Sequence, residues 1–388
     1  MATAQWGKFL TSDACIDYSE WMELTSLARS IFIFPLFAAL ACSNAHQPGS
    51  VPPANLAPLS NNTNPPRVAR NSTGTLGTIT RLDPALDALL APDAKIEILV
   101  DGIQWAEGPI WYNGGLFFSD VPQNTIYRWT PEAGVVPYLQ PSGYTGSTPR
   151  GGEPGSNGIT LDRQGHLVIC QHGDRRVARL EADGKITALA DKFEGKRFNS
   201  PNDLCFDSKG NLYFTDPPYG LEQKDKDPKK EMDLNGVYLL RASGELIRTS
   251  IDLKFPNGVA LSPDEKSLFI CVSDSTNPVI MKYDVQPDGN VANGKVFFDT
   301  TALLAKKLPG IPDGMKFDIY GNLWATGPGG VMILSPQGKH LGTLSTGVNT
   351  ANCAWGDDGS TLYITANHNL CRVKTKTRGV WPPGTKGR

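Results

Sequence analysis

Short runs in which apolar and polar residues alternate fill residues 95–375, separated by turns rich in Gly, Asp and Asn. Alternation with a period of two predicts β-strands that each bury one face. The 40 Gly and 30 Pro among the 388 residues indicate frequent turns and leave little room for long helices. The pattern therefore favours an all-β fold.

One unit of this pattern recurs six times. Each copy opens with a polar residue and a small one, continues as an apolar run, turns, and returns as a second apolar run. The first runs begin at Glu107, Asn157, Asn202, Asn257, Asp313 and Asn352. The spacing between copies leaves room for two further strands, and four short antiparallel strands form the blade of a β-propeller.

The two ends of the repeat predict how the ring closes. After Asn352 the chain supplies only three strands, whereas the apolar run at residues 95–100 precedes the first copy. We therefore expect a six-bladed β-propeller whose last blade is completed by this N-terminal strand, because closure hides both sheet edges. The propeller domain is predicted over residues 95–375 and a tail over residues 376–388.

Residues 1–42 are predicted to be an N-terminal extension with a signal or lipoprotein-type segment. The apolar run at residues 31–41 is too short for a membrane-spanning helix but typical of the core of a secretory signal. Ala39-Leu40-Ala41 before Cys42 fits a signal-peptidase site, and it also fits lipidation of Cys42. A buried core helix is the competing interpretation, and Met22 is an alternative start to Met1.

Residues 43–94 are rich in Pro, Asn and Ser and are expected to form a flexible tether with a short lead-in, which includes an amphipathic stretch at residues 83–90. A signal followed by a tether predicts export, with the domain periplasmic or held at the outer membrane through a lipid on Cys42. If the segment is not a signal, the protein is expected in the cytoplasm.

Charge and cysteine content exclude several function classes. The formal charge of −2 offers no basic face for a nucleic acid. No C-x-x-C spacing occurs among the seven cysteines, which argues against a zinc knuckle or a thioredoxin-type centre. Most of the five cysteines of the predicted propeller lie in or beside apolar strands, as small core residues do. The chain also lacks a G-x-S-x-G motif, so a serine esterase is not expected.

The six starting residues of the repeat carry the candidate chemistry. In a propeller the first strand of every blade lines the central channel, so these residues form a ring of two carboxylates and four amides at one rim. Such oxygen ligands suit a hard divalent cation. Asn-Gly and Asp-Gly are also common turn formers, which is a competing interpretation for each Asn. It does not explain Glu107, because a buried unpaired carboxylate is costly.

Other polar residues are predicted at the same rim. His172 ends a second strand there and is expected to bind substrate or assist proton transfer; the alternative is a surface histidine paired with Asp174. Asp120 and Asp216 are expected to shape loops. Two insertions at residues 141–156 and 217–234 are candidates for a substrate lid, with Tyr219 in the second. The charge run at residues 224–231 is expected to be solvated.

Five motifs resemble those of the senescence marker protein / gluconolactonase / luciferin-regenerating enzyme family, particularly its bacterial gluconolactonase-like branch, over residues 95–375. They are Trp105-Ala-Glu107-Gly-Pro, Ser200-Pro-Asn202-Asp203, Phe214-Thr-Asp216-Pro-Pro-Tyr-Gly, Phe255-Pro-Asn257-Gly and Ile311-Pro-Asp313-Gly. The resemblance implies lactone hydrolysis with one divalent ion, usually Ca²⁺ although Zn²⁺, Mg²⁺ or Mn²⁺ occur. By motif, the metal ligands fall on Glu107, Asn202, Asn257 and Asp313.

The resemblance also gives Asp313 a role as general base or nucleophile. The expected function is metal-dependent hydrolysis of a sugar lactone to an aldonic acid, in which the ion polarises the carbonyl group and Asp313 activates water. Substrate contacts are expected from His172, Asn157, Tyr219 and Asn352. The Arg that some animal members carry two residues before the third-blade Asn is Ser200 here, and Arg197 is a candidate to replace it.

The expected partner is a small-molecule lactone, and no oligomer is required. Two other functions stay open. A calcium-dependent phosphotriesterase would use the same four ligands in a more apolar pocket, and a non-catalytic propeller would serve as a binding platform. A strictosidine-synthase-like propeller is disfavoured because such propellers generally lack this set of acids and amides.

Overall fold

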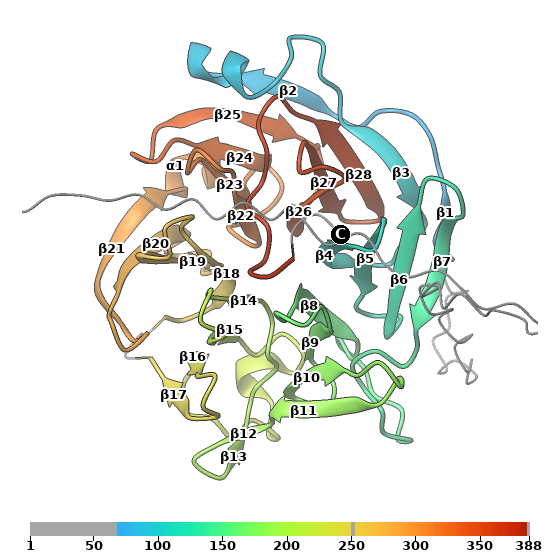
Figure 1. Ribbon diagram of the computed structural model, residues 1–388, viewed down its shortest axis with the longest axis vertical. Helices are drawn as coiled ribbons and strands as arrows, with labels where there is room; N and C mark the ends of the chain where they lie inside the picture. The colour runs from blue at the N-terminus through green and yellow to red at the C-terminus, as the bar shows by residue number, and fades with distance from the viewer. Residues whose placement is uncertain (1–67, 250–252, 386–388) are drawn as a thin grey trace, which may run out of the picture. The chain divides into compact units, whose positions relative to one another are not determined.

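The computed structural model describes residues 68–249 and 253–385 (Figure 1). The predicted signal segment at residues 1–42, with Cys42, and residues 43–67 of the predicted tether lie outside the described residues. Within the described residues, no helix combines the length and the apolar character that crossing a membrane requires.

The described residues form a six-bladed β-propeller, as predicted (Figure 1). Every blade is an antiparallel sheet, because consecutive strands are joined directly by turns and loops. The first strand of each blade is innermost (Figure 1). Blade 1 contains β4 (Ala106–Tyr112), β5 (Gly115–Asp120), β6 (Thr125–Thr130) and β7 (Gly134–Leu139). Blade 2 contains β8 (Ser156–Leu161), β9 (Leu167–Gln171), β10 (Arg176–Leu180) and β11 (Ile186–Ala190). Blade 3 contains β14 (Leu204–Phe206), β15 (Leu212–Asp216), β16 (Gly236–Leu240) and β17 (Leu246–Arg248).

Blade 4 contains β18 (Pro256–Leu261), β19 (Ser267–Val272), β20 (Val279–Val285) and β21 (Val291–Asp299). Blade 5 contains β22 (Met315–Phe317), β23 (Leu323–Gly327), β24 (Gly330–Leu334) and β25 (His340–Ser345). Blade 6 contains β26 (Asn352–Gly356), β27 (Thr361–Ala366), β28 (Asn369–Lys374) and the N-terminal strand β3 (Glu97–Asp101). The remaining elements are the β12 (Lys192–Phe193) and β13 (Lys196–Arg197) hairpin, the 3-10 helices η1 (Pro84–Ala88) and η2 (Lys224–Lys226), and the short helix α1 (Thr301–Leu304).

The ring closes through the N-terminal strand, as the sequence predicts. β3 pairs antiparallel with β28, with Val100 opposite Leu370 and Ile98 opposite Cys371. The pairing supplies the fourth strand that blade 6 lacks and joins residues from the two ends of the domain. This pairing covers the outer edge of β28, on which another chain could otherwise pair.

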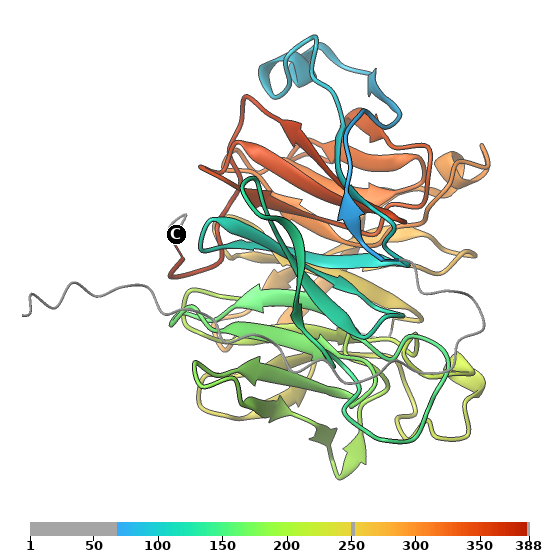
Figure 2. The same cartoon turned by 90° about the vertical axis from the view of Figure 1, so that its right-hand side faces the viewer.

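The expected tether at residues 43–94 differs from the structure over its second half. β1 (Arg70–Asn71) pairs with the outer side of β3, and β2 (Thr78–Arg81) pairs with β25, so blades 6 and 5 each gain a fifth strand. Figure 2 shows this segment, in blue, on the outside of the sheets. η1 falls within the expected amphipathic stretch and buries Leu86. β1 has two residues and β2 has four, which is too short for an alternation of apolar and polar residues to be recognised in the sequence.

The hydrophobic core lies between neighbouring blades. Six clusters of buried apolar side chains occupy the six blade–blade interfaces. At the closure between blades 6 and 1, Trp111 stacks on Tyr363 with ring centroids 5.3 Å apart. Between blades 5 and 6, Trp324 and Trp355 meet edge to face at 5.1 Å. The five cysteines of this part of the chain are free, four of them buried, as expected for small core residues.

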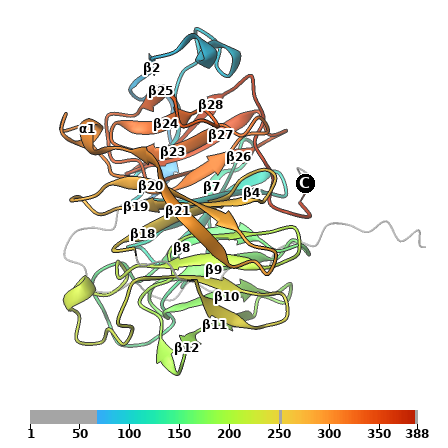
Figure 3. The same ribbon diagram turned by 90° about the vertical axis from the view of Figure 1, so that its left-hand side faces the viewer.

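The tail at residues 376–385 crosses one end of the channel. Val380 N donates to the Phe317 carbonyl at 3.0 Å and Gly379 N to the Gly359 carbonyl at 3.0 Å. Trp381, Pro382 and Pro383 cover a mostly apolar cavity of about 120 Å³ at the far ends of the inner strands. Figures 2 and 3 show this C-terminal segment and the yellow-green loop with η2 at opposite ends of the sheets. The start of every inner strand therefore faces the end away from the tail.

Candidate functional site

The starting residues of neighbouring blades touch through their backbones. Gly158 N donates to the Asn202 carbonyl at 2.7 Å, and Gly258 N donates to the Asp313 carbonyl at 3.0 Å. A Cβ added at Gly258 would lie 2.1 Å from the Asp313 carbonyl oxygen. Both glycines lie inside strands and neither has a positive φ. They are therefore needed for close approach of the next blade, and the turn-former interpretation of these Asn-Gly pairs is wrong.

All four predicted metal ligands line one pocket of about 390 Å³. Glu107 lies in β4 and Asn257 in β18, whereas Asn202 and Asp313 lie two residues before β14 and β22. The other lining residues are Trp105, Glu153, Asn157, Tyr219, Lys224, Ser273, Gly310, Ile311, Asn349 and Thr350. The inner strands of blades 1, 3, 4 and 5 thus bring two carboxylates and two amides together.

Hydrogen bonds hold the two amides in place. Asn202 Nδ2 donates to Asn257 Oδ1 at 2.5 Å, and Asn257 Nδ2 donates to Ser273 Oγ at 2.9 Å. Ser273 Oγ donates in turn to the carbonyl of Pro312, the residue before Asp313, at 2.5 Å. On the opposite side, Glu107 Oε2 accepts the Gly108 N–H at 3.1 Å.

The two carboxylates lack compensating positive charge. Burial raises the pKa of Glu107 to about 8, and the nearby carboxylates of Asp203 and Glu153 act in the same direction. Burial and the charges of Glu107, Asp203 and Glu153 raise the pKa of Asp313 well above its ordinary value. Lys224 is the one cationic side chain among the described residues that line the pocket. A bound divalent cation would supply the missing charge, so these residues fit such an ion.

The donor set is an oxygen site rather than a nitrogen or sulfur site. No group of three or more His, Cys, Asp or Glu side chains in residues 68–249 and 253–385 has an arrangement suited to a metal. Two of the four candidate ligands are amides, which supply carbonyl oxygens without charge. Carboxylate and amide oxygens are ligands that Ca²⁺ and other hard cations accept, with water completing the coordination.

Asp120 and Asp216 shape the segments that precede ligands, as expected. Asp216, at the end of β15, accepts the N–H groups of Asn199 at 2.8 Å and Ser200 at 2.7 Å, just before Asn202. Asp120, at the end of β5, accepts those of Gln104 at 2.9 Å and Trp105 at 3.2 Å, just before Glu107. Each carboxylate therefore fixes the backbone that carries a candidate ligand to the pocket.

The structure places two of the four expected substrate contacts at the pocket. Asn157 and Tyr219 line it, and Tyr219 stacks on Phe255 with ring centroids 6.2 Å apart. Asn352 does not line it, because its Oδ1 turns inward to accept the Cys353 N–H at 2.9 Å and lies 3.5 Å from Lys316 Nζ. The expectation that Asn352 contacts substrate is thereby corrected.

His172 also lies outside the pocket lining, which corrects the second expectation. Its side chain is fully buried behind Asn202, with Nε2 3.1 Å from Asn202 Oδ1. Gly220 packs directly against it, leaving no space even for a Cβ at residue 220. The alternative pairing with Asp174 is not formed, because Asp174 accepts from Thr145 and Arg176.

Both predicted insertions return to the pocket. The first, residues 141–156, supplies Glu153. No sequence pattern selects this residue, because it lies in a Gly- and Pro-rich loop. The second supplies Tyr219 and also Lys224, whose Nζ lies 5.9 Å from the centre of the Tyr219 ring. Lys224 is exposed, as expected for a solvated charge run, and within residues 224–231 Asp227 is the buried charged side chain.

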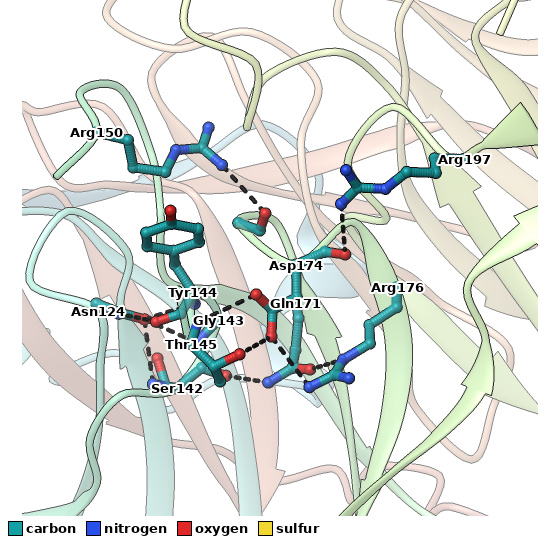
Figure 4. A network of polar contacts seen from close by, with 11 residues as sticks. Asn124, Ser142, Gly143, Tyr144, Thr145, Arg150, Gln171, Asp174, Arg176 and Arg197 are labelled. Atoms are coloured by element: carbon teal, nitrogen blue, oxygen red, sulfur yellow. Dashed lines mark hydrogen bonds and ion pairs between the residues drawn. The ribbon is translucent and has the colours of Figure 1, made fainter. Parts of the chain in front are cut away.

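A polar network fixes the base of the first insertion (Figure 4). Asn124 Oδ1 accepts the N–H groups of Ser142, Gly143 and Tyr144, the shortest at 2.7 Å. Gln171 Nε2 donates to the Ser142 carbonyl at 2.7 Å. Arg150 reaches from the loop to the carbonyls of Gly173 and Gly220, and so ties the first insertion to the second.

Arg197 is the candidate to replace the Arg that some animal family members carry at the position of Ser200, but its side chain makes its contacts outside the pocket lining. Its guanidinium donates to the Asp174 carbonyl at 3.2 Å (Figure 4), and it does not line the pocket. A role for Arg197 in direct substrate recognition is not supported by this position.

Comparison with known proteins gives close matches. The family described as SMP-30/Gluconolactonase/LRE-like region matches residues 105–368. A gluconolactonase of Zymomonas mobilis is 41% identical over 345 residues, which cover 85% of this chain and 95% of that protein. The solved structure of a Xanthomonas campestris gluconolactonase superimposes with a TM-score of 0.67 at 30% identity, covering 81% of this chain and 99% of the other.

A more distant relative carries a different activity in its name. The diisopropyl-fluorophosphatase of Loligo vulgaris is 26% identical over 258 residues, covering 62% of this chain and 78% of that protein. The matched region, the propeller and the convergence of the motif residues on one pocket agree with one another. The chain belongs to the SMP-30/gluconolactonase/LRE-like family.

Proposed function

We propose that this protein hydrolyses a sugar lactone to an aldonic acid and that it uses one divalent ion, Ca²⁺ in the first instance, held by Glu107, Asn202, Asn257 and Asp313. The observation that carries the proposal is the convergence of these four side chains, from four blades, on one pocket. The similarity to gluconolactonases over most of the chain supports the lactone as substrate class.

The proposed chemistry divides between the ion and the protein. When bound, the ion would act as a Lewis acid toward the lactone carbonyl and would offset the buried carboxylates. Asp313 takes a proton from the attacking water, because its carboxylate lies in the pocket and the charge of a bound ion would keep it ionised. Addition of water and opening of the ring give a hydroxy acid, which releases one proton at neutral pH.

The lining favours a polyhydroxylated substrate over a phosphotriester. Trp105, Gly310 and Ile311 are its apolar members, and the rest carry amide, hydroxyl, carboxylate or ammonium groups. Such groups can pair with the hydroxyls of a sugar lactone, whereas an apolar phosphotriester would leave them unpaired. The diisopropyl-fluorophosphatase among the distant relatives keeps hydrolysis of an organophosphorus compound as a second candidate.

Proton release by the full chain separates the candidates. The assay would compare D-glucono-1,5-lactone with a neutral phosphotriester at the same protein and calcium concentrations. Faster turnover of the lactone supports the proposal. Preferential turnover of the phosphotriester favours the second candidate, and turnover of neither substrate favours a non-catalytic binding platform.

We also propose that the protein is exported and acts on a small-molecule lactone outside the cytoplasm. The proposal rests on the signal-like sequence at residues 31–42. Fractionation of cells, with labelling by a radioactive fatty acid, tests it. Recovery of the full-length chain from the cytoplasm alone would contradict it.

A further inference from the structure

A chain of hydrogen bonds runs from blade 2 to blade 5 beside the pocket. It starts at His172, passes through the side chains of Asn202, Asn257 and Ser273, and ends at the carbonyl of Pro312. The four links measure 3.1, 2.5, 2.9 and 2.5 Å. The chain therefore connects both candidate amide ligands with the residue that precedes Asp313.

Each link of this chain can run in only one direction. A backbone carbonyl only accepts, so Ser273 must donate its proton to Pro312 and receive one from Asn257 Nδ2. Asn257 Oδ1 is then the acceptor for Asn202 Nδ2. Asn202 Oδ1 faces His172 Nε2, and since an amide oxygen carries no proton, the imidazole must donate.

We propose that His172 is a positioning residue: the proton on its Nε2 holds the Asn202 amide with Oδ1 toward the ion site, and through Asn202 it sets the direction of the whole chain. The inference rests on the proposed metal site. An amide oxygen has two lone pairs, so each Asn can accept one hydrogen bond of the chain and still bind a cation. A reversed Asn202 amide would present N–H groups to the ion.

The surroundings of His172 suit this role. The side chain is fully buried, so water cannot take the place of its Nε2–H. Its backbone N–H donates to the Gly155 carbonyl at 3.1 Å, and Gly220 packs against its Cβ. Nδ1 has no hydrogen-bond partner among the described residues, but it lies 3.5 Å from Glu153 Oε2. Both insertions therefore hold the imidazole, and its Nε2–H is the group that donates to Asn202 Oδ1.

Two variants of similar length separate donation from packing. His172→Gln retains an N–H near the position of Nε2, whereas His172→Met fills the space without a donor. We would titrate calcium into the metal-free full chain by calorimetry and record the unfolding midpoint of each variant in chelator. Loss of a residue that orients a metal ligand typically weakens affinity about 10- to 100-fold.

We expect His172→Met to bind calcium about 10- to 100-fold more weakly than the wild type. His172→Gln should bind calcium with an affinity within about threefold of the wild type. Two results would overturn the inference without affecting the proposed function. One is equal calcium affinity in the wild type and His172→Met, and the other is an equal loss of calcium affinity in His172→Met and His172→Gln. If the wild type binds neither calcium nor magnesium, manganese or zinc, the proposed metal site and the inference both fall.

A measurement on the wild-type protein avoids any folding defect of the variants. Long-range ¹H–¹⁵N NMR spectra report which ring nitrogen of a histidine carries the proton. A proton on Nε2 of His172, in the metal-free and in the calcium-loaded protein, supports the inference. Protonation of Nδ1 alone would overturn it.

Discussion

Asn202 Nδ2 donates to Asn257 Oδ1 across 2.5 Å, and this bond joins blade 3 directly to blade 4 at the pocket. Neither amide can turn without breaking the bond, so two of the four candidate ligands are already oriented toward each other. Preorganisation of this kind lowers the entropic cost of binding. The proposed ion would therefore bind with little rearrangement of these two side chains.

Replacement of Asp313 tests its role as general base. Asp313→Asn keeps the shape of the side chain but cannot take a proton, and general bases contribute about 10²- to 10⁴-fold to rate. We expect kcat for D-glucono-1,5-lactone to fall at least about 100-fold. The unfolding midpoint of the metal-free variant should not fall, because the substitution removes the Asp313 carboxyl group, whose burial costs stability when it is charged. A variant that retains more than a tenth of wild-type kcat would rule out this role.

Stability of the metal-free protein should depend on pH. The pKa of Glu107 is about 8 in the folded state against 4.5 in a free side chain, so the folded protein binds more protons between these values. The free energy of unfolding therefore falls as pH rises from about 5 to 8, by a few kcal/mol for this group. Burial also raises the pKa of Asp120 to about 6 and that of Asp216 to about 7, so both groups lower the free energy of unfolding as pH rises.

Thermal unfolding in chelator at pH 5 and at pH 8 checks this dependence, with Glu107→Gln as the comparison. The variant should show a smaller difference between the two pH values, and calcium should raise the wild-type midpoint most at pH 8. A wild-type midpoint that rises between pH 5 and pH 8 in chelator would contradict the assignment.

Asp216 should matter for calcium binding beyond its effect on stability. Asp207 is its counterpart in the same blade: it accepts the N–H groups of Lys209 and Asn211 at the far end of the β14–β15 hairpin. Loss of hydrogen bonds to a buried carboxylate should cost about 2–3 kcal/mol in either Asp216→Ala or Asp207→Ala. Only Asp216→Ala should weaken calcium affinity, by about tenfold or more. Equal calcium affinities in the two variants would show that Asp216 merely stabilises the blade.

The close approach of blades 4 and 5 can be tested at Gly258. In Gly258→Ala the new Cβ would overlap the Asp313 carbonyl, so the inner strand must shift and move Asp313 with it. We expect at least about 2 kcal/mol of lost stability and a tenfold or greater loss of kcat. Gly244→Ala is the control: it has a positive φ of 90° in open space, and it should cost about 1 kcal/mol without affecting kcat. Unchanged kcat in both variants would exclude a coupling of Gly258 to the site.

The sequence predicts most of this fold because the blade is repeated. Six copies of one pattern reveal the period even where a single copy is ambiguous, and the missing fourth strand of the last copy identifies the N-terminal strand β3. β1 and β2 are not predictable in this way. Their few residues contain no alternation, and only pairing with β3 and β25 makes them strands.

The candidate ligands are predictable because they occupy equivalent positions of the repeat, whereas residues from the insertions are not. Nothing in the local sequence distinguishes Glu153 from other loop carboxylates; its place at the pocket depends on contacts made by Asn124 and Arg150. Asn352 shows the opposite error. It has the right position in the repeat, but its oxygen is used by Cys353 N–H.

Calcium dependence of lactone hydrolysis tests the central claim most directly. Proton release from D-glucono-1,5-lactone by the full chain would be followed as purified, after removal of divalent ions by a chelator, and after calcium is restored. The account predicts loss of enzymatic proton release on chelation and its recovery with calcium. Hydrolysis that continues at an unchanged rate in the metal-free protein would contradict it.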